Sequence, residues 1–161
     1  MIGAIRQFFD KYVAPSRDSG EEVSGHALQI ATAALLIEMM RADTEISAEE
    51  QEVITRTMRS KFELTDEETA AVVNLAEDEI WKSTGYYEFT SLMNRSLSYG
   101  QKVKVIEHLW EVAFADAILD KHEEYMVRKV ADLIYVSHRD FIDAKLRVRK
   151  RYGVQESAGN G

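Results

Sequence analysis

The sequence predicts an all-α protein of about seven helices, arranged as a pseudo-two-fold repeat. The chain has 161 residues, 45% of them hydrophobic, and its only proline is Pro15, so no later proline breaks a helix. Apolar residues recur at helical spacing along most of the chain. Two segments also match at a constant offset of 73 residues, which places Glu38 on Glu111 and Ala42 on Ala115. Each copy has the pattern of a helix, a short acidic turn and a new helix, which predicts two like units with their turns together.

The first 23 residues predict an amphipathic helix followed by a linker. The large apolar side chains on one face of this helix are Ile2, Ile5, Phe8, Phe9 and Tyr12. Proline, serine and glycine then predict the linker. We expect the helix to dock on the chain's own body, because leaving these side chains in water is unfavourable. A homodimer through this helix and insertion into a membrane surface are the alternatives.

The main helical domain is expected over residues 24–152. Its first long helix covers about residues 24–43. Capping boxes at Ser47–Glu50 and Thr65–Glu68 then start two further helices, since each box satisfies two amides at a helix end. The side chains expected on the buried faces of these helices are Leu28, Ala31, Leu35, Met39, Ala42, Val53, Ile54, Met58, Phe62, Val72, Val73 and Ala76.

The second half of this domain repeats the order. One helix is expected to end near Gly100, and a long helix then leads to the second acidic turn. Asp120 is expected as the N-cap of the next helix, with Glu123 as the acid of its capping box, and Ser137 opens the last helix. Residues 153–161 predict a disordered tail. The apolar side chains expected to be buried are Phe89, Leu92, Met93, Leu97, Val105, Leu109, Val112, Ala115, Met126, Val130, Leu133, Ile134, Phe141, Ile142, Leu146 and Val148.

Charge is unevenly distributed along the chain. The formal net charge is −8, which argues against a nucleic-acid partner. Residues 38–79 contain 13 acids and 4 basic residues, whereas Lys145–Tyr152 contains five basic residues and no acid. The basic run either complements a helix macrodipole or forms a docking patch for an acidic partner or an anionic membrane. The absence of cysteine excludes disulfides and cysteine nucleophiles and is typical of a cytoplasmic protein.

The residue patterns of common enzymes are missing from the sequence. A ferritin-like di-iron site needs Glu-x-x-His pairs, and none occurs. The sequence has neither a glycine-flanked serine nucleophile nor a phosphate-binding glycine loop. His108 and Glu111 lie three residues apart and are expected to be boundary residues of one helix face. We therefore expect no catalytic residues and no enzymatic activity.

The two acidic turns resemble a known family. The segments Leu35–Glu50 and Leu109–Glu123 both contain Glu-x-x-x-Ala-Asp ahead of an acidic helix start. In this the chain is similar to the TerB-like family, the tellurite-resistance protein B family, over roughly residues 24–152. The resemblance implies an all-helical, cytoplasmic or membrane-tethered module of stress and metal-resistance systems, with an acidic, cation-binding surface. A related domain precedes the J-domain of some DnaJ-like co-chaperones.

The chain departs from this family's pattern in one respect. The glycine that commonly follows each aspartate is Thr44 in the first turn and Ala117 in the second. Since a turn with positive φ is less favourable without glycine, we expect either a tighter, helical turn or a loop that only approximates the family's geometry.

The acidic residues of the two turns are candidate metal ligands, and the set is Glu38, Asp43, Glu50, Glu111, Asp116 and Glu123. Calcium or magnesium is the expected ion, because hard cations take several oxygen ligands. An EF-hand is excluded, since a loop starting at Asp43 has Ala48 and Ile54 where that motif needs glycine and glutamate. The alternative is that the glutamates cap helices and the aspartates bond to turn amides.

Together these observations predict a non-catalytic cytoplasmic interaction module. It is expected to bind a protein partner, and a divalent cation at its acidic turns, as part of a stress or metal-resistance system. The alternative function is a peripheral membrane adaptor at the inner face of the membrane, which uses the N-terminal amphipathic helix as its anchor.

Overall fold

The structure is a computed structural model that describes residues 3–13, 24–42, 46–76, 87–115 and 117–152. These ranges contain eight α-helices and one π-helical segment, and no strand. The elements are α1 (Ala4–Phe8), η1 (Phe9–Val13), α2 (Gly25–Ala42), α3 (Ala48–Phe62), α4 (Asp66–Ala76), α6 (Tyr87–Ser96), α7 (Tyr99–Ala115), α8 (Ala117–Leu133) and α9 (His138–Tyr152). The predicted all-α fold is confirmed.

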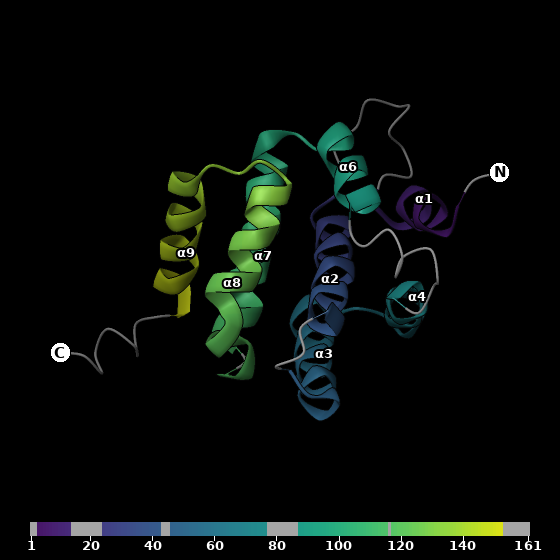
Figure 1. The fold of residues 1–161 in the computed structure, drawn as a ribbon, viewed down its shortest axis with the longest axis horizontal. Coiled ribbons are helices and arrows are strands. Elements are labelled where there is room, and N and C mark those ends of the chain that lie inside the picture. The colour runs from purple at the N-terminus through teal and green to yellow at the C-terminus, as the bar shows by residue number, and fades with distance from the viewer. Residues whose placement is uncertain (1–2, 14–23, 43–45, 77–86, 116, 153–161) are drawn as a thin grey trace.

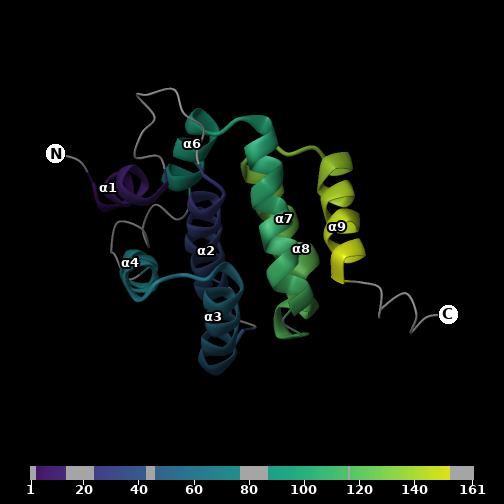
Figure 2. The ribbon, with the colours of Figure 1, turned by 180° about the vertical axis from the view of Figure 1, so that it is seen from behind.

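Helices α2 and α7 form the centre of the molecule. Helix α7 packs against α2, α3, α8 and α9, while α2 also contacts α3, α4 and η1. Figure 1 shows α9 at one end of the long axis and α1 and α4 at the other, and the view from behind in Figure 2 shows the same order. The core is built around large buried side chains, of which Trp110, Phe9, Phe62, Phe89 and Phe141 are the bulkiest.

The N-terminal helix docks on the chain's own body, as expected. The side chains of Ile5, Phe8, Phe9 and Val13 are buried in the main core. The Phe9 ring lies edge-on to the ring of Phe89, with 5.6 Å between their centroids. The segment therefore contributes to the chain's own core. The linker that follows it, residues 14–23, lies outside the described residues.

Two predicted capping boxes are confirmed. The Ser47 hydroxyl accepts from the Glu50 amide at 3.1 Å, and the Glu50 carboxylate accepts from the Ser47 amide at 3.0 Å. The Thr65–Glu68 box has the same two bonds, at 3.0 and 2.9 Å. Ser137 opens α9 as expected, because its hydroxyl accepts from the Asp140 amide at 3.2 Å.

Several local predictions are wrong. Asp120 is not an N-cap, because α8 already begins at Ala117 and places Asp120 inside the helix. Gly100 does not end a helix, since it lies in the first turn of α7. Leu146 and Val73 are exposed rather than buried. The buried face of α9 is formed by Phe141, Ala144 and Val148, which follow helical spacing. Leu146 lies on the opposite face of the helix.

The two copies of the repeat agree at the ends of α2 and α7 but differ at the starts of α3 and α8. Helix α2 ends at Ala42 and α7 ends at Ala115, which are equivalent positions in the two copies. However, α8 begins at Ala117, whereas the helical start at Ala48 in the first copy is equivalent to Lys121. A single residue thus separates α7 from α8, which agrees with the tighter of the two geometries expected without glycine. The superposition of the two copies stays a prediction.

Candidate functional site

The helix ends that flank the two acidic turns lie at the same end of the helical bundle. Helices α2 and α7 pack against each other, and so do α3 and α8. Figure 1 shows α2 and α7 ending at the lower end of the molecule, where α3 and α8 begin. The fold therefore brings the helix ends next to the two predicted turns to one end of the molecule. Asp43 and Asp116 themselves lie outside the described residues, as does the side chain of Glu123.

The Glu38 carboxylate is the most notable acidic group of the first copy. Its residue is only 8% exposed, and it lies four residues before the C-terminal end of α2 at Ala42. Burial of a carboxylate carries a large desolvation cost. The negative end of the helix macrodipole adds to this cost, because it repels anions within the last turn. Positive charge close to Glu38 would therefore stabilise this end of the bundle.

Glu111, the equivalent residue of the second copy, is bound by the protein's own cationic groups. Its carboxylate lies 2.9 Å from Nδ1 of His108 and 3.5 Å from a guanidinium nitrogen of Arg151. Burial has the largest single influence and raises the pKa of Glu111, but the hydrogen bond from His108 and the charges of His108, Arg151 and Lys61 outweigh it and leave the pKa below its usual value. Glu111 is thus a stabilised anion.

A second carboxylate of α7 extends this charged cluster. The Glu107 side chain is 9% exposed. Its Oε2 accepts two bonds from the guanidinium of Arg147, at 3.1 and 2.8 Å, and its Oε1 accepts one from Arg151 at 3.2 Å. These bonds tie α9 to α7 across 40 and 44 residues of chain. The sequence alone did not predict this cluster, because its basic run suggested only a partner for the helix macrodipole or a docking patch.

Glu50 is used for capping, as the alternative to metal binding predicts. One of its oxygens accepts from the Ser47 amide, so the residue completes the capping box of α3. Within the described ranges, no group of three or more histidines, cysteines, aspartates and glutamates lies close enough together to hold a metal ion. Of the six predicted ligands, the structure therefore places Glu38, Glu50 and Glu111, and gives each a different environment.

A further charged contact joins the N-terminal ends of α2 and α4. Nε2 of His26 lies 2.9 and 3.1 Å from the two oxygens of Glu68, and its Nδ1 lies 3.0 Å from the Gln29 side chain. The hydrogen bond with Glu68 is the main cause that raises the pKa of His26 above its ordinary value, although burial opposes it. Glu68 also belongs to the capping box of α4, so this contact fixes the start of one helix against another.

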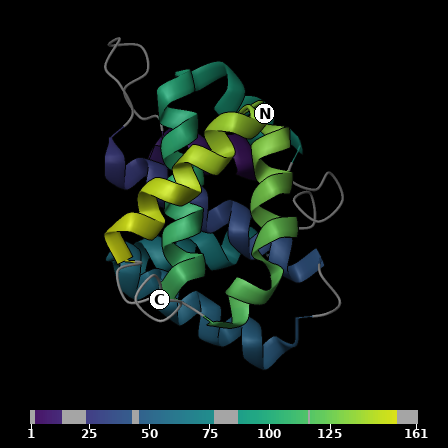
Figure 3. The same ribbon diagram turned by 90° about the vertical axis from the view of Figure 1, so that its left-hand side faces the viewer.

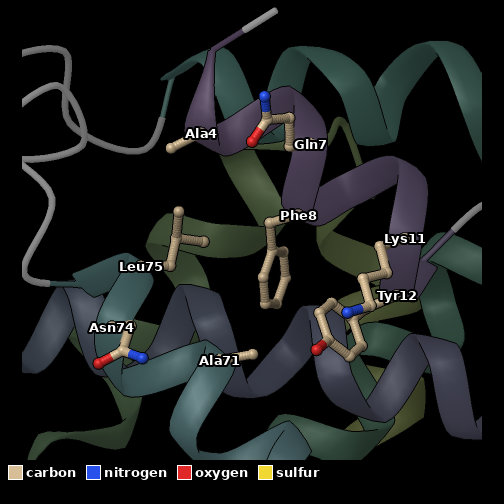
Figure 4. A pocket seen from close by; sticks show the side chains of 8 residues that line it. All are labelled: Ala4, Gln7, Phe8, Lys11, Tyr12, Ala71, Asn74 and Leu75. Atoms are coloured by element: carbon tan, nitrogen blue, oxygen red, sulfur yellow. The ribbon is translucent and has the colours of Figure 1, made fainter.

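An open pocket of about 320 Å³ lies between the N-terminal segment and α4. Figure 4 shows Phe8 and Leu75 in this pocket, with Lys11 and Tyr12 on one side. The complete lining is Ala4, Gln7, Phe8, Lys11, Tyr12, Ala71, Asn74 and Leu75. The Tyr12 hydroxyl donates to Glu67 at 3.0 Å, which closes one side of the contact. The sequence analysis gave no sign of this pocket, because it forms only when the N-terminal helix docks.

Fold and site together define an all-helical module with two acidic helix-turn-helix units. Comparison with protein-family models matches residues 29–146 to the family described as Tellurite resistance protein TerB. Because this match spans most of the chain, the protein belongs to the TerB family. No curated protein matches the chain, and neither does any solved structure. Among the described residues, no helix is long and apolar enough to cross a membrane.

Proposed function

We propose that this TerB-family chain is a non-catalytic interaction module. It binds a divalent cation at the acidic end of its helical bundle, and a protein partner binds the cation-bound form. The observation that carries the proposal is the buried carboxylate of Glu38 near the negative end of α2. Calcium and magnesium prefer oxygen ligands and supply the positive charge that such a position favours. A role in a stress or metal-resistance system follows the family's description.

The neighbours of Glu111 argue against a cation at the second copy. In the first copy, Glu38 lies in the last part of α2, five residues before Asp43, a further candidate ligand of the sequence. In the second copy, the Glu111 carboxylate already contacts His108 and the guanidinium of Arg151, and the permanent positive charge of Arg151 repels a metal ion. The proposal therefore places the cation at the first turn, with Asp116 and Glu123 as the only remaining contributors from the second.

The partner is proposed to be a protein, and the location cytoplasmic. The net charge of −8 supports the exclusion of nucleic acid as a partner, because phosphate backbones repel an acidic surface. The alternative role as a peripheral membrane adaptor, and dimerisation through the N-terminal helix, both require its apolar face. The side chains of Ile5, Phe8 and Phe9 from that face are buried on the body of the chain, so either role would first require the segment to undock.

A thermal-shift experiment tests the proposal. The melting temperature of the wild type should rise on addition of millimolar calcium or magnesium and return with chelator, since a ligand that binds only the native state stabilises it by mass action. Glu38→Gln should remove this rise. Glu49→Gln is the matched control, because Glu49 is an exposed acid at the start of α3 and lies outside the candidate set. A wild type whose melting temperature does not respond to either ion would contradict the proposal. An equal loss of the ion-dependent rise in Glu38→Gln and Glu49→Gln would contradict it too.

A further inference from the structure

The outward face of α9 is the feature that neither the family nor the cation site explains. Helix α9 packs against α7 and α8 and forms one end of the molecule, as Figure 1 shows. Figure 3 views this end directly, with α9 crossing in front of α7 and α8. The buried side of α9 is formed by Phe141, Ala144 and Val148. Its opposite side therefore faces away from the body of the protein.

Four of the six basic residues of α9 divide into two groups. Helix α9 carries six basic and two acidic residues, a formal charge of +4 within a chain of net charge −8. Arg147 and Arg151 turn toward α7, where Glu107 and Glu111 bind them. Arg139 and Lys150 are exposed on the outward side. The internal ion pairs thus account for only part of the positive charge.

We define the α9 face as Arg139, Leu146, Arg149 and Lys150. Asp143 lies beside this face, 4.0 Å from Arg139, and removes one unit of its charge. The face therefore keeps an excess of positive charge.

An apolar side chain lies among these cations. Leu146 is 51% exposed, and helical spacing places it one turn before Lys150, with Arg149 beside it. A surface with one exposed leucine and several surrounding cations is typical of helices that lie on anionic lipid, where the leucine enters the boundary of the acyl chains and the cations remain at the headgroups.

We propose that the α9 face docks the protein on an anionic phospholipid bilayer. A bilayer suits it better than an acidic protein does. The face is a single exposed helix without the buried aromatic anchors and pockets that specific protein interfaces use, and its one exposed leucine supports only shallow insertion. The acidic residues of α4 do not prevent this contact, because α4 lies at the far end of the molecule from α9 and charges are screened over about 8 Å at physiological salt.

Vesicle co-sedimentation of the full chain tests this proposal. We expect the wild type to sediment with vesicles that contain phosphatidylserine, less so as salt is raised, and not with pure phosphatidylcholine. The variant Arg139→Glu with Lys150→Glu should lower the partition coefficient at least about fivefold for each cation lost. The matched control is Arg56→Glu with Arg95→Glu, which changes the net charge equally at exposed residues of α3 and α6. Unchanged melting temperatures establish that the variants fold.

Leu146→Ser provides a second test with unchanged charge. It should weaken binding to phosphatidylserine vesicles without altering its salt dependence. The proposal is overturned by equal binding to phosphatidylcholine, by no binding to either vesicle, or by a control that loses as much binding as the α9 variant. Stronger binding to soluble polyglutamate than to vesicles would instead assign the face to an acidic protein.

Discussion

Replacement of Phe9 with alanine tests whether the N-terminal segment belongs to the folded core. Phe9 is completely buried and lies edge-on to Phe89 at 5.6 Å. Removal of a buried phenylalanine side chain costs about 3–5 kcal/mol. The aromatic pair adds about 0.5–1.5 kcal/mol beyond the buried area, so we expect the upper half of that range. This is a large fraction of the roughly 5–15 kcal/mol by which domains of this size are stable.

Urea unfolding measures this loss directly. With a slope of about 2 kcal/mol per molar urea, a loss of 4 kcal/mol lowers the unfolding midpoint by about 2 M. Tyr12→Phe is the matched control, because it removes only the exposed hydroxyl that donates to Glu67 and should cost less than about 1 kcal/mol. The slope should stay the same in both variants.

A loss below about 1 kcal/mol for Phe9→Ala would refute the reasoning, because an interaction arm leaves the stability of the body unchanged. Deletion of residues 1–20 gives an independent result. A monomer that keeps its stability without this segment would show that the docked helix contributes nothing to the fold.

Four further predictions follow from single contacts. Ser47→Ala should lower the free energy of unfolding by about 0.5–2 kcal/mol, measured in urea with chelator present, because it removes the N-cap of α3. Asp120→Ala should show no loss of this kind, since the residue lies inside α8; an equal loss would contradict that placement. His26→Gln should remove a pH-dependent part of the stability. Because Glu68 raises the pKa of His26, the stability that this contact contributes is fully present below the unfolded-state pKa of about 6.5 and is lost as the pH rises through the folded-state pKa. Identical melting temperatures of the wild type and His26→Gln across that pH range would argue against the contact. Glu107→Gln should destabilise by about 1.5–3 kcal/mol, because it weakens charged hydrogen bonds to α9, and a change within error would show that α9 is held by apolar contacts alone.

Local chemistry made much of the fold predictable. The Ser47–Glu50 box is visible in the sequence because its two bonds join residues three apart, and the structure has both. Helical periodicity likewise identified Phe89, Leu92 and Met93, which are all buried. Such features depend on the helix itself and need no knowledge of its neighbours.

Contacts between distant segments could not be predicted in this way. Glu107 and Arg147 are 40 residues apart, and no periodicity links them before α7 and α9 pack together. Asp120 was misassigned because its sequence fits an N-cap, while the alanine at position 117 already permits the helix to begin. For the cation site, the sequence identified Glu38 and Glu111 as equivalent, but only tertiary structure reveals that the Arg151 guanidinium lies beside Glu111.

Calorimetric titration with calcium and with magnesium tests most directly whether the acidic end of the bundle binds a divalent cation. We expect a saturable heat of binding for the wild type and for Glu49→Gln. This heat should be lost in Glu38→Gln and in a variant with both Asp43→Asn and Asp116→Asn. Absence of binding heat for both ions in the wild type, or unchanged affinity in the variants, would contradict this expectation.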